Sequence, residues 1–253
     1  MLECVVNISE GRDRRVLDAL AQAAGTDLLD VHTDPWHHRS VFTLVGEDAP
    51  RRLAAAAVDS IDLRAHSGVH PRIGVVDVVP FVPLAGSTPA DAIGARDRFA
   101  AWMEAELSVP CLVYGPERTL PELRRQAGEI AGHPTAGRCA VGARDLLVAY
   151  NLWLVDADVE LARRVAATVR CPAIRALGLP VGDRVQVSMN LVEPLVVGPV
   201  DAWDRVAEHA EVAGAELVGL VPDAVLRGAP ERRWAALDLS PSRTIEARLA
   251  ARR

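Results

Sequence analysis

The chain has 253 residues, a net charge of −6 and a sequence pI of about 5.7, and half of its residues are hydrophobic. An acidic chain with 4% aromatic residues is not expected to bind nucleic acid, because phosphate contacts need a basic face and base stacking needs aromatic rings. All 28 basic residues are arginine, which excludes Schiff-base chemistry, covalently held pyridoxal phosphate and a P-loop lysine, and leaves arginines, backbone N–H groups and helix N-termini to hold anions.

Hydrophobic periodicity predicts the elements of the first half in chain order. They are a strand at 2–8, a helix with Val16 and Leu20 on its apolar face, strands at 26–32 and 39–46, a helix at 50–62, a strand at 74–83, a helix at 88–107, a short strand at 111–114 and a helix at 119–131. The first six elements follow the order β-α-β-β-α-β of ferredoxin-like domains. Gly and Pro mark residues 132–137 as a linker.

The same order repeats in the second half. The predicted elements are a strand at 146–155, a helix at 158–170, strands at 174–180 and 185–192, a helix at 202–213 and a strand at 216–221, before a charged tail with a helical signal at 241–251. We therefore expect an α+β protein of two ferredoxin-like β-α-β-β-α-β subdomains, residues 1–142 and 143–253, with facing sheets and a cleft between them.

The strand at 185–192 alternates polar and apolar residues. Its period of two places Gln186, Ser188 and Asn190 on one face. If the apolar residues of the strand face the helices, the polar face looks away from that core, toward an interdomain cleft of the kind that often binds ligands. An ordinary half-solvated sheet face explains the same pattern, and without other evidence it is the favoured interpretation. Asn151 has the same two interpretations.

A short histidine-containing motif precedes the strand at 74–83. Gly68 interrupts any helix before it, and Pro71 favours an extended conformation at His70. The His70 imidazole therefore stands at the entrance to an apolar strand, with Arg72 two residues later. This pattern suits a general base beside an anion-binding cation. Taken alone, it is also explained as a turn that carries a polar histidine.

Two more polar segments lie in the first half. Residues 7–11 (NISEG) join a strand to a helix, so the N–H groups at the helix start could hold a carboxylate, unless Ser9 simply caps the helix. Residues 30–39 (DVHTDPWHHR) concentrate acids, histidines and an arginine in a connection between strands. Arg64 ends the second helix, and Asp77 lies within the apolar strand that follows the histidine motif.

A metal site is a possible interpretation of these side chains, because they are of ligand types. The candidates are Asp30, Asp34, His37, His38, His66 and His70. Their spacing is poor, since Gly68 and Pro71 argue against the helix that would place His66 and His70 on one face, and no metal is expected. Nucleophile-elbow and dinucleotide motifs are missing too, which leaves acid–base chemistry by histidine.

The four cysteines, Cys4, Cys111, Cys139 and Cys171, never approach CxxC spacing. They are expected to be buried small hydrophobes in a reducing compartment. No signal peptide precedes the first strand, and no apolar run is long enough to span a membrane. A cytoplasmic protein with no membrane partner is therefore expected.

Six segments of the chain, read together, resemble the formiminotransferase domain of glutamate formimidoyltransferases, a domain that is also found fused to a cyclodeaminase. They agree in order and spacing along nearly the whole chain. The segments are ECVVNISEG (3–11), LLDVHTDPWHHRSVFTLVG (28–46), GVHPRIGVVDVVPFVPL (68–84), TAGRCAVGARDLLVAYNLWL (135–154), VQVSMNL (185–191) and ELVGLVP (216–222).

The resemblance implies transfer of a formimino group from N-formimino-L-glutamate to N5 of tetrahydrofolate, a co-substrate, without a metal. It implies that His70, in the HPR motif, is the catalytic acid and base. Both substrates carry carboxylates, which suits Arg39, Arg64 and Arg72 as bidentate partners. The expected substrate-binding residues are these three arginines together with Asn7, Ser9, Asp34 and Asn190. Pro134, Thr135, Ala136 and Gly137 match part of the family's folate-contacting loop. A homodimer with a role in one-carbon and histidine metabolism is expected from the family.

The chain also departs from the family pattern. The stretch between the helix at 119–131 and Pro134 is short, Val6 stands where proline is usual, and His32 stands where aspartate is frequent. His37 and His38 replace small polar residues. These departures leave open a transferase with another formimino or formyl donor, a non-catalytic folate- or anion-binding paralogue, and a metal-dependent hydrolase that uses the histidine cluster.

Overall fold

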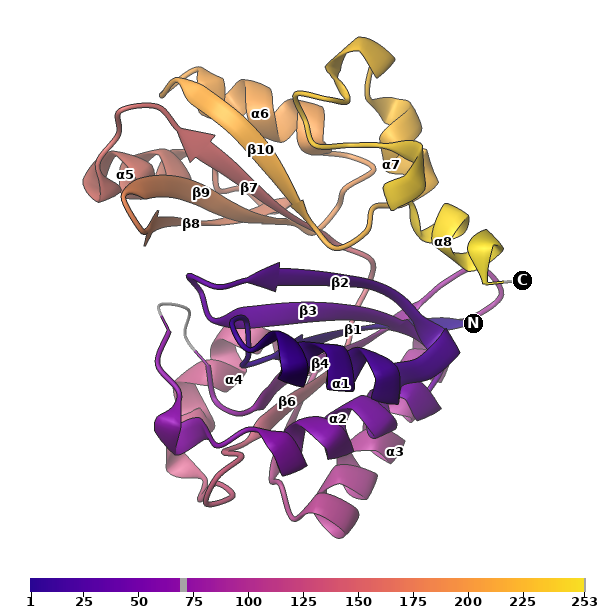
Figure 1. Cartoon of the computed structure of the whole chain (residues 1–253). Helices are drawn as coiled ribbons and strands as arrows, with labels where there is room; N and C mark the ends of the chain where they lie inside the picture. The colour runs from indigo at the N-terminus through magenta and orange to yellow at the C-terminus, as the bar shows by residue number, and fades with distance from the viewer. Residues whose placement is uncertain (69–71, 253) are drawn as a thin grey trace. The chain divides into compact units, whose positions relative to one another are not determined.

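A computed structural model of the chain describes residues 1–68 and 72–252. The chain divides into two compact units, Met1–Asp145 and Leu146–Arg253, and each is described by itself (Figure 1). The division follows Asp145, close to the boundary expected after residue 142.

Unit 1 contains a six-stranded sheet in the order β2-β3-β1-β4-β6-β5. Its strands are β1 (Leu2–Ile8), β2 (Leu28–Asp34), β3 (Arg39–Val45), β4 (Val76–Pro83), β5 (Cys111–Tyr114) and β6 (Cys139–Ala143), and its helices are α1 (Arg14–Ala24), α2 (Asp48–Ser60), α3 (Pro89–Leu107) and α4 (Leu120–Gln126). The four strands β1 to β4 pair antiparallel and form the expected ferredoxin-like arrangement, which β6 and β5 extend as parallel strands.

Two apolar clusters cover the two faces of this sheet. The larger cluster includes Leu20 of α1, Leu53 of α2 and Phe99 of α3, which pack against Val79 and Phe81 of β4. The smaller cluster joins Leu123 of α4 to strand residues that include Val78 and Leu112. Since successive strand residues point to opposite faces, helices α1 to α3 lie on one face and α4 lies on the other.

Unit 2 repeats the ferredoxin-like order with a four-stranded antiparallel sheet, β10-β7-β9-β8. Its elements are β7 (Val148–Leu154), α5 (Val159–Val169), β8 (Ile174–Val181), β9 (Arg184–Leu191), α6 (Pro199–Ala207), β10 (Val212–Val218), α7 (Asp223–Gly228) and α8 (Ile245–Ala251). Helices α5 and α6 lie on the same side of the sheet (Figure 1). Both expected repeats are therefore confirmed as topology, whereas the facing of the two sheets stays a prediction.

The polar face of β9 lies where its alternation predicts. Val187, Met189 and Leu191 belong to the core of unit 2, so Gln186, Ser188 and Asn190 are on the opposite face of the sheet. On that face Asn151 of β7 donates a hydrogen bond to Glu216 of β10 at 2.9 Å.

The segment 132–137 was expected to be a linker, and this expectation is wrong. The N–H of Val75 donates to the carbonyl oxygen of Ala136, and the N–H of Arg138 donates to that of Ile73. The segment therefore belongs to unit 1, and it leads into β6, which the periodicity did not predict. Helix α7 was not predicted either.

Several element boundaries also differ from expectation. β2 begins at Leu28 and not at residue 26, because Gly25–Asp27 form a 3₁₀ turn in which Gly25 has a φ of 72°. A left-handed φ of this kind is readily available to glycine. α6 ends at Ala207, and β10 begins at Val212, ahead of the predicted 216–221.

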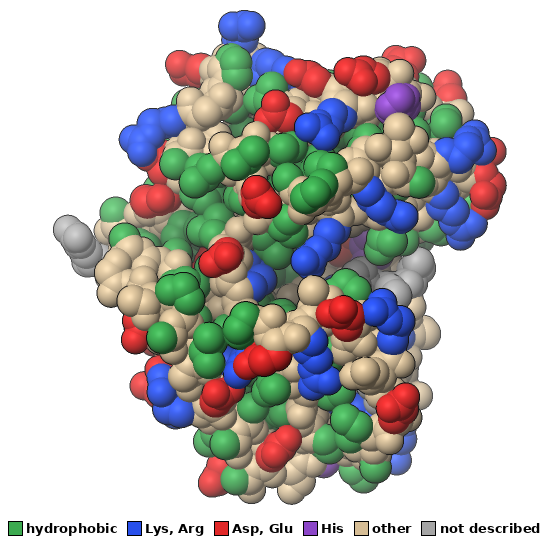
Figure 2. All heavy atoms as spheres, turned by 180° about the vertical axis from the view of Figure 1, so that it is seen from behind, with side chains coloured by type: hydrophobic (Ala, Val, Ile, Leu, Met, Phe, Trp, Pro, Cys, Tyr) green, Lys and Arg blue, Asp and Glu red, His purple; other side chains and the backbone are tan. Residues whose placement is uncertain are grey.

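All four cysteines are free thiols, and Cys4 and Cys139 are buried as expected, whereas Cys111 and Cys171 are only partly buried. Within the described residues, every helix is too short or too polar to cross a membrane. Acidic and basic side chains are interspersed over the molecular face that Figure 2 shows.

Candidate functional site

The polar residues of unit 1 gather where β1 ends and where β3 and β4 begin. Because β1 runs antiparallel to both neighbours, its last residues lie beside the first residues of β3 and β4. The same edge of the sheet thereby receives the turn after β1 (Ser9–Asp13), the loop before β3 (Asp34–Arg39) and the approach to β4 (Arg72–Asp77).

Asp77 is the buried centre of this edge. Asn7 of β1 pairs with Val78 and Ile8 pairs with Val76, so a register shift leaves Asp77 in a β-bulge, a feature that redirects a side chain. Asp77 is 0% exposed. Its Oδ2 accepts hydrogen bonds from Arg39 at 2.7 Å and from Arg124 of α4 at 2.8 Å, and its Oδ1 accepts from the N–H of Ile73 at 2.7 Å.

One carboxylate thus faces two guanidinium groups, and the local charge is positive. Burial alone would raise the pKa of Asp77, but Arg39 and Arg124 hold it below its usual range. Burial lowers the pKa of Arg39, an effect that Asp77 opposes and that the nearby charges of Arg124 and Arg72 reinforce. An excess of partly buried cations is an arrangement that favours an anionic ligand, and guanidinium groups bind carboxylates well.

The turn after β1 holds a carboxylate that belongs to the chain itself. Glu10 Oε1 accepts hydrogen bonds from the N–H groups of Gly11, Arg12 and Asp13 at 2.7–2.9 Å. These donors were expected to bind a substrate carboxylate or to be capped by Ser9. The cap of α1 is instead Asp13, and the buried Ser9 hydroxyl donates to the carbonyl oxygen of Gly74 at 2.8 Å, which ties the end of β1 to the start of β4.

The loop before β3 is ordered by Asp34. One oxygen of Asp34 accepts from the N–H groups of Trp36 and His37, and the other contacts His37 Nδ1. Burial tends to raise the pKa of Asp34, but its hydrogen bonds with His37 lower it. Asp34 therefore shapes the loop that presents His38 and Arg39.

His38 connects this loop to the approach to β4. Its Nε2 lies 3.1 Å from Glu10 Oε1, and its Nδ1 lies 2.8 Å from the carbonyl oxygen of Ser67. Its ring stacks on that of His66, with 3.8 Å between the ring centroids. Arg72 donates to the carbonyl oxygens of Gly68 and His66 at 3.4 and 3.3 Å, so this cation also lies beside the histidine pair.

The segment with the expected folate-loop residues lies against the start of β4. Pro134–Gly137 is closed by two hydrogen bonds between the backbones of His133 and Gly137. Gly74 and Gly137 form an isolated antiparallel β-bridge ahead of β4 and β6, and a Cβ added at Gly74 would overlap the carbonyl oxygen of Arg138. Thr135 and Ala136 direct their N–H groups to His133 Nδ1.

The remaining site residues that the sequence predicts do not all lie at this edge of the sheet. His70, with Val69 and Pro71, lies outside the described residues. Arg64 pairs with Asp62 on the surface, and Asn190 is exposed on β9 of unit 2. Asn7 accepts a hydrogen bond from Arg39 Nε at 3.1 Å, so it supports the arginine that is bound to Asp77.

Arg124 is a site residue that the sequence did not reveal. It lies in a short surface helix next to a second arginine, and no local pattern separates it from an ordinary solvated side chain. Asp77 gave a visible signal, because an acid within an otherwise apolar strand needs a buried partner.

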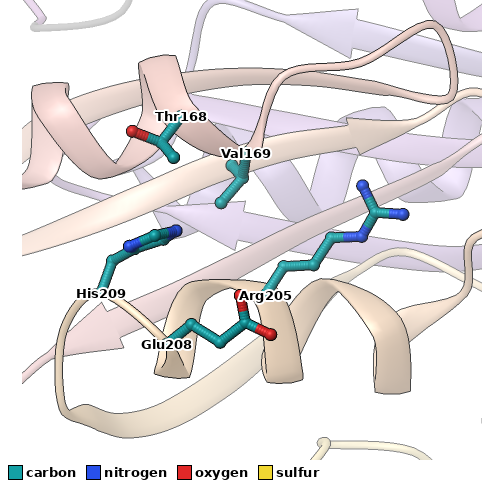
Figure 3. Close-up of a pocket in the computed structure, with 5 residues that line it drawn as sticks. All are labelled: Thr168, Val169, Arg205, Glu208 and His209. Carbon is teal, nitrogen blue, oxygen red and sulfur yellow. The ribbon is translucent and has the colours of Figure 1, made fainter.

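Among the described residues, no group of three or more His, Cys, Asp and Glu side chains is placed to hold a metal ion. Unit 2 has a surface pocket of about 340 Å³ between α5 and α6, lined by Thr168, Val169, Arg205, Glu208 and His209 (Figure 3). It contains none of the predicted site residues, and the arginine cluster belongs to unit 1.

The fold and this edge define a two-unit α+β protein with a site that contains arginines, carboxylates and histidines. The model of the formiminotransferase domain, N-terminal subdomain, matches residues 1–127. The glutamate formimidoyltransferase of Streptococcus pyogenes serotype M1 is 34% identical over 88% of this chain and 89% of its own length. That of Thermoplasma acidophilum is 32% identical over 89% of both chains. The formimidoyltransferase-cyclodeaminase of Sus scrofa is 32% identical over 88% of this chain and 50% of its own length.

The chain belongs to the formiminotransferase family, and it is a transferase.

Proposed function

We propose that this protein transfers the formimino group of N-formimino-L-glutamate to N5 of tetrahydrofolate. The family supports transfer of a formimino group. The names of the relatives indicate that the donor of this group is a glutamate derivative. The structural observation that favours the proposal is the Arg39–Asp77–Arg124 cluster, because both substrates are carboxylates and the cluster has an excess of positive charge.

In this proposal the arginines hold the glutamate portion of a substrate. Arg39 is fixed by Asp77 and Asn7, so little side-chain freedom is lost when an anion binds. Arg124 shares the same carboxylate oxygen from another element. Two guanidinium groups held by one buried acid form a preorganised platform, which is what positioning two substrates for direct transfer requires.

His70 is proposed as the acid and base, on the basis of the family resemblance of its HPR motif. It would take the N5 proton as this nitrogen attacks the amidine carbon, and return a proton to the glutamate nitrogen as the tetrahedral intermediate collapses. Both steps are proton transfers at nitrogen, so no covalent enzyme intermediate is needed. General acid–base help of this kind is worth about 10²–10⁴-fold.

The segment Pro134–Gly137 is proposed to contact the folate. Its backbone bonds to Leu63 and Val75 place it next to the approach to β4, and Pro134 is exposed. The short stretch before it changes the loop relative to the family, so folate affinity is the property that we expect to differ most among relatives.

The direct test incubates the purified protein with tetrahydrofolate and N-formimino-L-glutamate and follows acid-converted methenyltetrahydrofolate by absorbance. Product above the no-enzyme control is expected. The variant His70→Asn should lose about 10²–10⁴-fold in kcat while it still binds tetrahydrofolate in a fluorescence titration. Folate binding without any transfer from formimino or formyl donors would favour a non-catalytic binding protein.

The arginine platform has its own test. Arg124→Gln should raise the KM for N-formimino-L-glutamate or tetrahydrofolate by about 10-fold or more, since a hydrogen bond to a charged group contributes about 1.5–3 kcal/mol. The neighbouring Arg125→Gln is the matched control, because Arg125 shares the helix and is not part of the cluster. Equal KM changes in the two variants would contradict the assignment of Arg124.

A further inference from the structure

Of the two ring nitrogens of His66, one has a hydrogen-bond partner and the other has none among the residues that the structure describes. Its Nε2 lies 3.1 Å from the carbonyl oxygen of His38. A carbonyl oxygen can only accept, so Nε2 carries the hydrogen, and in the neutral ring Nδ1 then holds a bare lone pair. Nδ1 is buried and finds no hydrogen-bond partner among the residues that the structure describes. A buried polar atom of this kind calls for an explanation, such as a ligand.

The surroundings keep this lone pair free of a proton. Burial lowers the pKa of His66 to about 4, and the charges of Arg72 and His38 act in the same direction. The carbonyl oxygen of His38 and the more distant Glu10 oppose this shift only in part. At neutral pH His66 is therefore an uncharged imidazole with a buried acceptor atom.

The orientation of His66 is held from two sides. The stacked ring of His38, with planes 14° apart, fixes the plane of His66, and His38 is itself held between Glu10 and Ser67. Arg72 donates to the backbone oxygen of His66 at 3.3 Å. A rigid and neutral acceptor beside the Arg72 guanidinium suits recognition of a substrate N–H group.

We propose that His66 Nδ1 accepts a hydrogen bond from the N–H of the formimino group and thereby selects a formimino donor over a formyl donor. The inference rests on the proposed function and deepens it. A formimino group carries N–H at the position where a formyl group carries a carbonyl oxygen. An oxygen there would face the imidazole lone pair, so two acceptors would oppose each other and neither would be satisfied. Sites that bind a substrate N–H reject analogues that lack it for this reason.

The test compares kcat/KM for N-formimino-L-glutamate and N-formyl-L-glutamate in the wild type and in His66→Leu. A leucine side chain has no acceptor for the formimino N–H and no lone pair to oppose a formyl oxygen. The variant should lose about 10- to 100-fold with the formimino donor, the range expected when one buried hydrogen-bond donor loses its partner. It should lose little or gain with the formyl donor, so the ratio of the two should fall.

The control variant is His209→Leu, because His209 is an exposed histidine of unit 2 and its replacement should leave the ratio unchanged. His66→Gln, whose amide can donate to the carbonyl oxygen of His38 and place its own oxygen near the position of Nδ1, should restore most of the preference for the formimino donor. Thermal melts verify that each variant is folded.

A second readout does not depend on turnover. Long-range ¹H–¹⁵N NMR spectra should show His66 as the Nε2–H tautomer, and its Nδ1 resonance should shift when N-formimino-L-glutamate is added. A folded His66→Leu variant with an unchanged donor ratio, or an Nδ1 resonance that does not shift when the ligand is added, would overturn the inference. A wild type that transfers neither group would instead overturn the proposed function.

Discussion

Asp77 shows how much depends on single residues in this protein. Its side chain is fully buried between Arg39 and Arg124, and it also accepts the N–H of Ile73. A buried ion pair adds little when compared with an apolar replacement, but the removal of one partner is costly. The charge of Asp77 therefore matters for stability as well as for the positions of the two arginines.

The variant Asp77→Asn keeps the shape of the side chain and removes its charge, so two partly buried guanidinium groups face a neutral amide. We expect the free energy of unfolding to fall by about 3–5 kcal/mol, measured by urea unfolding at pH 7. Glu47→Gln is the control, because Glu47 pairs with the exposed Arg98, and exposed pairs contribute little. A loss in Asp77→Asn no larger than in the control would contradict this role.

Low pH should destabilise the fold by protonating a second carboxylate of the site, that of Glu10. Burial opposes ionisation of Glu10, but the N–H groups of Asp13 and Arg12, together with His38, lower its pKa. A carboxyl group with a lower pKa in the folded chain binds fewer protons there than in the unfolded chain. Its stabilisation is complete above the unfolded pKa of about 4 and is lost as the pH falls through the folded value.

We therefore expect the free energy of unfolding to decrease as the pH is lowered from about 5 to about 3. Glu10→Gln removes one group from this linkage and should flatten part of the slope. Urea unfolding at several pH values measures both slopes. Identical slopes for the variant and the wild type would mean that Glu10 ionises alike in the folded and unfolded chains.

At the scale of elements, the site is assembled by close backbone contacts. The approach to β4 and the segment before β6 meet at Gly74 and Gly137, and Gly137 has a φ of 71°. A Cβ at Gly137 would lie 2.5 Å from the carbonyl oxygen of Ile73. The two glycines therefore allow the proposed folate segment to lie directly against the strand that carries Asp77.

Gly74→Ala should destabilise unit 1 by about 1–3 kcal/mol or more, because the added methyl group overlaps backbone that cannot move freely. Gly128→Ala is the matched control, since a Cβ there meets nothing within 4 Å. Thermal unfolding followed by circular dichroism distinguishes the two. Equal melting temperatures would indicate that the contact between the two segments relaxes easily.

The element that the sequence did not predict has a physical explanation. β6 has the sequence Cys-Ala-Val-Gly-Ala, and all of its residues are buried. It lies between β4 and β5 as a parallel strand, so both of its faces are covered and no alternation of polar and apolar residues marks it. Amphipathic elements such as α1 and β9 were found because one face of each is apolar.

At the scale of the whole molecule, each unit has a core of its own. The apolar clusters of unit 1 end at Ala143, and that of unit 2 begins at Val148. Unit 2 contains a complete ferredoxin-like sheet with helices packed on it. A domain that has its own hydrophobic core can in principle fold alone.

We expect residues 146–253, produced as a separate chain, to unfold in one cooperative transition. Near-ultraviolet circular dichroism and urea unfolding measure this property, and residues 1–145 serve as the matched second fragment. A fragment that binds hydrophobic dyes and melts gradually would show that unit 2 needs the rest of the chain for its packing.

The sequence by itself determined both ferredoxin-like repeats and the polar segments around β1, β3 and β4, because side-chain periodicity is a local property that each segment carries. It also determined the family, through motifs spread along the chain. Only the tertiary structure decided that Glu10 contacts His38, that His38 stacks on His66, and that Asp77 binds Arg124 of α4. Those partners are far apart in sequence, and they meet only through strand register, one β-bulge and the packing of α4, none of which any local pattern encodes.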